Sequence, residues 1–207
     1  MAGQNARLSR RQFLAGSIAP LSVPRTARRP NVLFILPDQM RAQALGCMGN
    51  RDVRTPHLDR LASQGVLFQN TLANTPVCCP ARAILMTGQY CHQNGMVAND
   101  LRLRESHVTL AKVLRGAGYR TGFIGKWHLD GGKRLPGFVP PGPRRQGFEF
   151  WAANECSHRH FETQYFRDSP KPIPIQKFEP EAWTDIGIEF LTASPTQWVA
   201  RRVQISR

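Results

Sequence analysis

The chain has 207 residues, of which 41% are hydrophobic and 20% are charged, so it is long enough for one domain with a hydrophobic core. No apolar run approaches the length of a membrane-spanning helix, so we expect no stable membrane insertion. The formal net charge is +14, but the arginines cluster near the two chain ends, without zinc-finger spacing or interleaved aromatic residues. We therefore expect no nucleic-acid partner, and a basic nucleic-acid binder is the least favoured alternative.

Residues 1–30 are interpreted as an export signal with a linker. Residues 9–14, Ser-Arg-Arg-Gln-Phe-Leu, match the twin-arginine pattern, and a short, mildly apolar run follows them. This pattern predicts a periplasmic or secreted protein. No Ala-x-Ala cleavage site follows, so a basic arm without a targeting role stays open as the alternative.

Residues 31–36, Asn-Val-Leu-Phe-Ile-Leu, form an apolar run rich in strand-forming residues. Such a run predicts a central strand buried on both faces. It is followed by Asp38 and Gln39, and polar side chains just past the carboxyl end of a buried strand lie where α/β folds place their sites. The alternative for these two residues is a surface turn.

Residues 55–65 carry the signals of a helix: a threonine at the N-cap, a proline at the first helical position and a glycine at the end. Leu58 and Leu61 would share its buried face, and His57 would be exposed. Residues 66–68, Val-Leu-Phe, are interpreted as a strand.

Residues 74–90 predict a loop that leads into a helix ending at Gly88. Cys78 would lie at or next to the N-cap, and Arg82, four residues later, would share its face of the helix. That face combines a nucleophile precursor, a fixed positive charge and the N–H groups of a helix start, which together favour an anion. The alternative is that Cys78 and Cys79 are two buried structural thiols. The chain's five cysteines fit no metal cage or small disulfide framework, so their pairing stays open.

Residues 109–117 predict an amphipathic helix, and a short strand is expected at 121–124. The helix residues expected to face inward are Leu110, Val113 and Leu114. After the strand, Lys126 and His128 are two positions apart, so in extended chain they project to the same side while Trp127 packs on the other.

The later part of the chain has fewer signals. Residues 132–147 are rich in Gly, Pro and Arg and are interpreted as a surface loop. His158 and His160 would lie on one side of a short strand, but a zinc pair is not favoured because no further ligands accompany them. Residues 180–192 predict a helix whose core positions are Ile186, Ile188, Phe190 and Leu191.

Four of these stretches together resemble the formylglycine-dependent sulfatases. The signature C-x-P-x-R is present as Cys78-Cys79-Pro80-Ala81-Arg82 and is followed by Thr87-Gly88. Only Cys78 has proline two positions later and arginine four positions later, so Cys79 is the free position of the motif. The other similar stretches are Gly-Lys-Trp-His at 125–128, Thr-Pro-x-Leu-Asp-Arg-Leu-Ala at 55–62 and the apolar run that leads to Asp38-Gln39.

The resemblance implies hydrolysis of a sulfate ester on a sulfated small molecule or glycan. Cys78 would be oxidised to formylglycine by a formylglycine-generating or anaerobic sulfatase-maturing enzyme, and the hydrated aldehyde would attack sulfur. Ca²⁺ would be held by Asp38, Gln39 and the modified Cys78. Arg82 and Lys126 would stabilise the sulfate charge, and His128 would contact the formylglycine hydroxyl.

The fold implied is an α/β, alkaline-phosphatase-like three-layer sandwich with a mostly parallel sheet. The resemblance covers about residues 31–192, and residues 193–207 lack the apolar strand and Pro-His motif expected there. We therefore expect an incomplete fold, truncated near residue 193, with activity impaired by the missing metal ligands and with exposed apolar surface. The alternatives are a phosphonate or phosphate ester hydrolase of the same superfamily and a non-catalytic sulfatase fragment.

Overall fold

The structure is a computed structural model that describes residues 29–132, 134–193 and 198–201. The chain divides into two units, residues 1–30 and residues 31–207, and the fold described below is that of the second. The twin-arginine motif at 9–14 lies outside the described residues, so the export signal remains a prediction.

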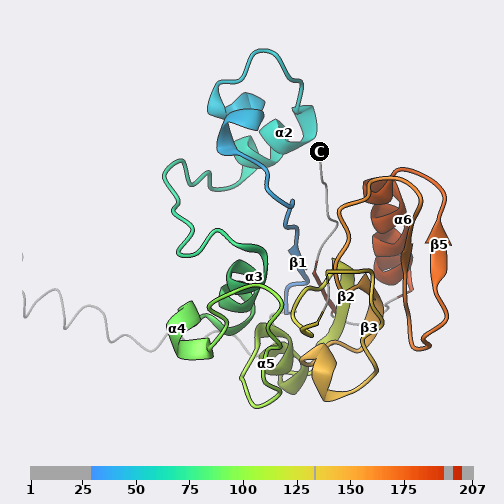
Figure 1. Ribbon diagram of the computed structural model, residues 1–207. Coiled ribbons are helices and arrows are strands. Elements are labelled where there is room, and N and C mark those ends of the chain that lie inside the picture. Colours follow the sequence, from blue (N-terminus) through green and yellow to red (C-terminus); the bar gives the residue numbers. More distant parts are fainter. Residues whose placement is uncertain (1–28, 133, 194–197, 202–207) are drawn as a thin grey trace, which may run out of the picture. The chain divides into compact units, whose positions relative to one another are not determined.

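A parallel sheet of four strands forms the centre of the second unit, in the order β1-β6-β2-β3 (Figure 1). The strands are β1 Val32–Phe34, β2 Arg120–Lys126, β3 Phe150–Asn154 and β6 Trp198–Arg201. A separate antiparallel pair is formed by β4 Thr163–Tyr165 and β5 Ile173–Ile175. Since the four strands are parallel, their carboxyl ends meet at one edge, where α/β proteins place ligands.

Helices connect these strands. The α-helices are α2 Pro56–Gln64, α3 Cys78–Thr87, α4 Cys91–Asn94, α5 Leu110–Gly116 and α6 Glu179–Thr192. Short 3₁₀ helices lie at η1 Ala42–Ala44, η2 Gly46–Met48 and η3 Pro143–Arg145. Among the described residues no helix combines the length and hydropathy needed to cross a membrane.

Alternating side chains of β2 assign the layers. Phe123 points into a core built with α3 and α5, where its ring lies 4.9 Å from Trp127 and 5.2 Å from Trp151 between centroids. Ile124 points into a second core, built with α6 around Trp183 and Phe190. The sheet therefore has helices on both faces, as in a three-layer α/β sandwich.

The predicted central strand at 31–36 is wrong in its burial. β1 is only three residues long and lies at an edge of the sheet, where it pairs with β6 alone among the described strands. Leu33 and Ile35 are 49% and 46% exposed because no described element packs over them. The apolar run thus leaves the uncovered surface that the resemblance led us to expect.

Two other strand expectations also need correction. Residues 66–68 form no strand, and Val66 is 79% exposed, because nothing in the described chain pairs with this segment. Residues 193–207 were expected to lack a strand, yet β6 forms at Trp198–Arg201 and its backbone pairs with both β1 and β2. Backbone hydrogen bonding between two strands supports this strand where the sequence pattern had given no signal.

Helix α5 is correctly placed, but its buried face is not the predicted one. Val113 is 57% exposed, whereas Ala111 is buried. The helix lies so close to Gly147 that a Cβ atom there would come within 2.7 Å of the Lys112 nitrogen. A small residue at position 111 permits this approach, which a leucine-lined face would prevent.

Helix α2 begins at Pro56 and ends before Gly65, as predicted, but it buries no residue, and Leu61 is 63% exposed. In α6, Ile186 and Phe190 are buried as predicted, whereas Ile188 is 54% exposed. These helices have the predicted positions, but the neighbouring elements decide which side chains are covered.

Candidate functional site

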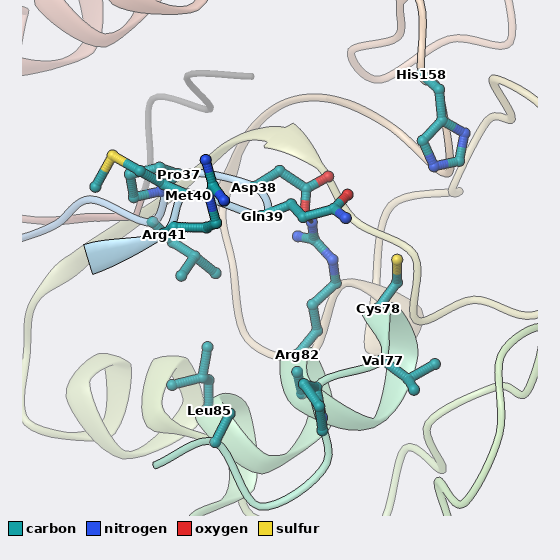
Figure 2. A pocket seen from close by; sticks show the side chains of 14 residues that line it. Pro37, Asp38, Gln39, Met40, Arg41, Val77, Cys78, Arg82, Leu85 and His158 are labelled. Carbon is teal, nitrogen blue, oxygen red and sulfur yellow. Dashed lines mark hydrogen bonds and ion pairs between the residues drawn. The ribbon is translucent and has the colours of Figure 1, made fainter. Parts of the chain in front are cut away.

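Helix α3 begins at the cysteine that the motif singles out. Cys78 is its first residue, Val77 is the N-cap, and Gly88 ends the helix in the left-handed conformation at φ 67°. Cys78 lines a pocket of about 620 Å³, and Figure 2 shows its sulfur pointing in the same direction as the Arg82 side chain. The pocket lies between α3 and the segment that follows β1, and His158 lies across from them.

Arg82 is buried one helical turn after Cys78, with 5% of its surface exposed. Its guanidinium donates to the backbone oxygen of Lys126 at 2.9 Å and to the Asp38 carboxylate at 3.3 Å. Burial lowers the pKa of Arg82, and the Asp38 charge opposes that shift. A guanidinium stays protonated in proteins, so Arg82 is a fixed cation in the pocket wall.

Lys126 is the last residue of β2 and is 1% exposed. Its Nζ lies 3.4 Å from Asp38 Oδ2, 3.2 Å from His158 Nε2 and 4.0 Å from Cys78 Sγ. Two buried cations therefore meet at one carboxylate, beside the thiol. Since two positive charges face one negative charge, this cluster favours an additional anion.

The start of α3 contributes through its dipole more than through free N–H groups. The Cys79 N–H donates to the side-chain oxygen of Asn99 at 2.9 Å, and Pro80 has no N–H to offer. Sequence reasoning had counted these groups as available to a ligand, and this expectation is corrected here. The positive end of the helix dipole still lies at Cys78.

The two neighbouring cysteines have different environments. Cys79 is completely buried, its sulfur accepts from the Asp100 N–H at 3.3 Å, and burial raises its pKa to about 11. Cys78 is half-buried and faces the pocket. Since reactive cysteines are partly exposed and lie near cations, Cys78 is the thiol that a modifying enzyme or ligand can reach.

His128 lies beside this group and contacts Asp100. Its Nε2 is 3.5 Å from Asp100 Oδ1, and the same carboxylate accepts from Arg134 Nε at 3.1 Å. Burial and the nearby charge of Lys126 lower the pKa of His128 to about 4. The imidazole is therefore neutral at pH 7, and its buried Nδ1 makes no hydrogen bond to any described residue.

A buried carboxyl group lies close behind His128. The side chain of Glu155 accepts from the Asp130 N–H at 2.9 Å, and its other oxygen has no hydrogen bond among the described residues. Burial raises the pKa of Glu155 to about 7. The backbone oxygen of Glu155 accepts from the His128 N–H at 2.7 Å, so the two groups belong to one structural unit with opposite pKa shifts.

Asp38 and Gln39 both line the pocket, and Gln39 has a positive φ of 57°. A non-glycine residue in this region is strained, and such strain concentrates at functional sites. No group of three or more His, Cys, Asp or Glu side chains that could hold a metal is present in the part of the chain that the structure describes. The oxygen donors of Asp38 and Gln39 fit calcium in kind, but Ca²⁺ takes about six to eight oxygen ligands.

His158 is a pocket residue that the sequence reasoning missed as a site residue. It follows β3, and β3 pairs in parallel with β2 so that Asn154 lies opposite Lys126. Residues just past Asn154 therefore lie at the carboxyl edge beside Lys126, and that register was the signal that could have found His158. His160 instead packs against Phe178, with ring centroids 6.5 Å apart, so the two histidines form no pair and no strand carries them.

Comparisons with known proteins agree on one family. A family model described as Sulfatase matches residues 30–198. An ulvan-active sulfatase of Formosa agariphila is 44% identical over 155 residues, which are 74% of this chain and 30% of that protein. An N-acetylglucosamine-6-O-sulfatase of Bacteroides thetaiotaomicron is 32% identical, over 79% of this chain and 28% of that protein.

The solved structures give the same result. A Bacteroides fragilis protein described as a sulfatase superposes with a TM-score of 0.79 and 32% identity, over 86% of this chain and 43% of the other. A protein solved with its substrate D-glucosamine-2-N,6-O-disulfate has a TM-score of 0.73 and 29% identity, over 86% and 34%. These likenesses confirm the predicted alkaline-phosphatase-like α/β fold, and the chain spans less than half of each of these four relatives.

Proposed function

The chain belongs to the sulfatase family, and on that premise we propose that it is the N-terminal part of an enzyme that hydrolyses sulfate esters through Cys78. The observation that carries this proposal is the meeting of Cys78 with two buried cations. Lys126 Nζ lies 4.0 Å from the Cys78 sulfur, and Arg82 lines the same pocket one helical turn away. A sulfate group is a tetrahedral anion, and this arrangement offers it positive charge from two directions.

The two cations have the larger part in stabilising charge. Arg82 and Lys126 are held by the Asp38 carboxylate and by the β2 backbone, so they need little rearrangement when a ligand enters. Preorganised charge in a water-poor site is the main source of transition-state stabilisation in many enzymes. Removing one such group typically costs about 100- to 1,000-fold in kcat.

Cys78 requires modification for this chemistry. When it is converted to formylglycine, the hydrated aldehyde supplies a hydroxyl nucleophile and a second hydroxyl that lets sulfate leave. The half-buried position of Cys78 and the complete burial of Cys79 support Cys78 as the converted residue. The partner implied is a formylglycine-generating or anaerobic sulfatase-maturing enzyme.

His128 and His158 are placed to handle protons. If the His128 Nε2–H donates to Asp100, its Nδ1 carries a lone pair in a buried position and can accept a proton. The pKa of His158 is lowered mainly by the charge of Lys126, so His158 is neutral and its Nε2 can accept a hydrogen bond from Lys126 Nζ. We assign His128 as a proton acceptor and His158 as a group that orients Lys126.

Asp38 and Gln39 are proposed as part of a calcium site. Bound Ca²⁺ would add positive charge opposite the sulfate oxygens. The described residues provide two oxygen donors beside two cations, which is too few for a complete site. The remaining ligands must come from outside the described residues, so we route no step of the reaction through the ion.

The substrate class proposed is a sulfated glycan. The name of the Formosa agariphila relative and the sugar disulfate bound by a solved relative support this class. We also propose export to the periplasm or medium, on the twin-arginine motif at residues 9–14.

The experiment that tests the function is hydrolysis of an aryl sulfate by protein made together with a maturing enzyme. Cys78→Ala is expected to abolish turnover, whereas Cys91→Ala, at another half-buried cysteine, keeps it. Sulfatase activity that survives Cys78→Ala would overturn the assignment. An aryl phosphonate assayed in parallel separates this proposal from the alternative of a phosphonate hydrolase.

A further inference from the structure

A second pocket adjoins the candidate site and shares one wall with it. It has a volume of about 350 Å³ and lies between residues 134–136 and 156–164. His158 lines both pockets, so the second begins where the first ends. Pockets of about 300–1,000 Å³ are the usual size of small-molecule sites.

The walls of the second pocket suit a saccharide. Ser157, Thr163 and Gln164 provide hydroxyl and amide groups, and Leu135 and Pro136 provide an apolar side. The hydroxyls of Ser157 and Thr163 lie 3.1 Å apart, and each hydroxyl can make further hydrogen bonds. A ring with several hydroxyl groups and one apolar face matches such a lining.

The charge of the second pocket is positive. Arg134 and Arg159 line it together with one carboxylate, Glu162. Arg134 uses its Nε for Asp100, which leaves both terminal nitrogens without a hydrogen bond to described residues. The guanidinium of Arg159 makes no hydrogen bond or ion pair within the described part of the chain; only its backbone N–H is used, by Ser157.

We propose that this second pocket is the subsite for the alcohol part of the ester, and that its arginines select a sugar bearing an acidic group besides the sulfate that is removed. The inference rests on the proposed function, because a sulfate held at Cys78 and Lys126 projects its ester oxygen and sugar past His158 into this pocket. Guanidinium groups bind carboxylates and sulfates through paired N–H donors. The acidic group is therefore a carboxylate or a second sulfate.

The test is a binding measurement on the 207-residue protein by calorimetry, which needs no modified cysteine. The probes are a monosulfated disaccharide with a uronic acid, its methyl ester, and a disaccharide with a second sulfate in place of the carboxylate. We expect at least one acidic probe to bind about tenfold or more tightly than the ester, since a charge-assisted hydrogen bond is lost in the ester. The acidic probe with the larger preference identifies the acidic group.

Two variants separate the subsite from the sulfate site. Arg159→Gln should reduce the preference for acidic probes about tenfold, whereas Arg54→Gln, at an exposed arginine outside the pocket, should not. Equal binding of acidic and neutral probes, or an unchanged preference in Arg159→Gln, would overturn the subsite. If Arg82→Met leaves the binding of every probe unchanged, the proposed function itself is wrong.

Discussion

The prediction that probes the site most closely is the replacement of Arg82 by methionine. Methionine keeps an apolar stem in the pocket wall but removes the guanidinium that contacts Asp38 at 3.3 Å and the Lys126 backbone oxygen at 2.9 Å. A hydrogen bond to a charged group is worth about 1.5–3 kcal/mol. Since about 1.4 kcal/mol is tenfold in affinity, binding of inorganic sulfate should weaken by about 10- to 100-fold.

The same change alters stability in two opposing ways. The Lys126 carbonyl loses a buried partner, which costs about 1–3 kcal/mol, but the protein no longer has to bury a guanidinium. We therefore expect a small decrease in Tm and a large loss of affinity. Sulfate titration by calorimetry and thermal unfolding by circular dichroism measure both quantities, with Arg54→Met as the matched control.

Two outcomes would refute this reasoning. The first is sulfate affinity within about twofold of the wild type in a folded Arg82→Met protein, far below the 10- to 100-fold that a lost charge-assisted hydrogen bond implies. The second is a loss of affinity of equal size in Arg54→Met, which would assign binding to overall charge. If Arg82→Met does not fold, Arg82→Lys keeps a cation and tests the loss of the planar, two-pronged contact instead.

Three further predictions concern pH, calcium and association. The pKa of His128 is lowered to about 4 and that of Glu155 is raised to about 7. As pH rises, the lowered histidine adds stability between about 4 and 6.5, and the raised carboxyl removes it between about 4.5 and 7. The free energy of unfolding should therefore change little with pH in the overlap, rise with pH in Glu155→Gln and fall in His128→Gln; parallel urea titrations of all three proteins that show one common slope would contradict this. Calorimetry should find calcium binding weaker than about 1 mM, because Asp38 has two cations as neighbours, and micromolar binding would mean that the described residues form a complete site. Sedimentation should show concentration-dependent association that decreases in the double variant Leu33→Lys, Ile35→Lys, since both side chains are about half exposed, and a monodisperse wild type would count against this surface.

The candidate site could be read from the sequence where short-range chemistry decides it. Helix α3 begins at Cys78 and ends at Gly88 because proline and glycine allow few other conformations there. β2 ends at Lys126, as the Gly-Lys-Trp-His stretch predicted, and the parallel register then brings Lys126 to Asp38. Local signals and one rule about parallel sheets were sufficient for these residues.

The residues that the sequence did not assign depend on contacts between distant segments. His158 enters the pocket only because β3 lies beside β2, which no local pattern states. The face of α5 was misjudged because its close approach to Gly147 selects Ala111 as the buried side chain over the larger Val113. The strand at 31–36 was expected to be central, but its burial depends on neighbours that the described chain does not provide.

The central claim is that Cys78, and not its neighbour, becomes the reactive group of a sulfate ester hydrolase. Mass spectrometry of the tryptic peptide that ends at Arg82 tests it most directly, after production together with a formylglycine-generating enzyme. We predict an aldehyde at Cys78 and an unchanged thiol at the buried Cys79. Thiols at both positions, or an aldehyde at Cys79, would contradict the claim.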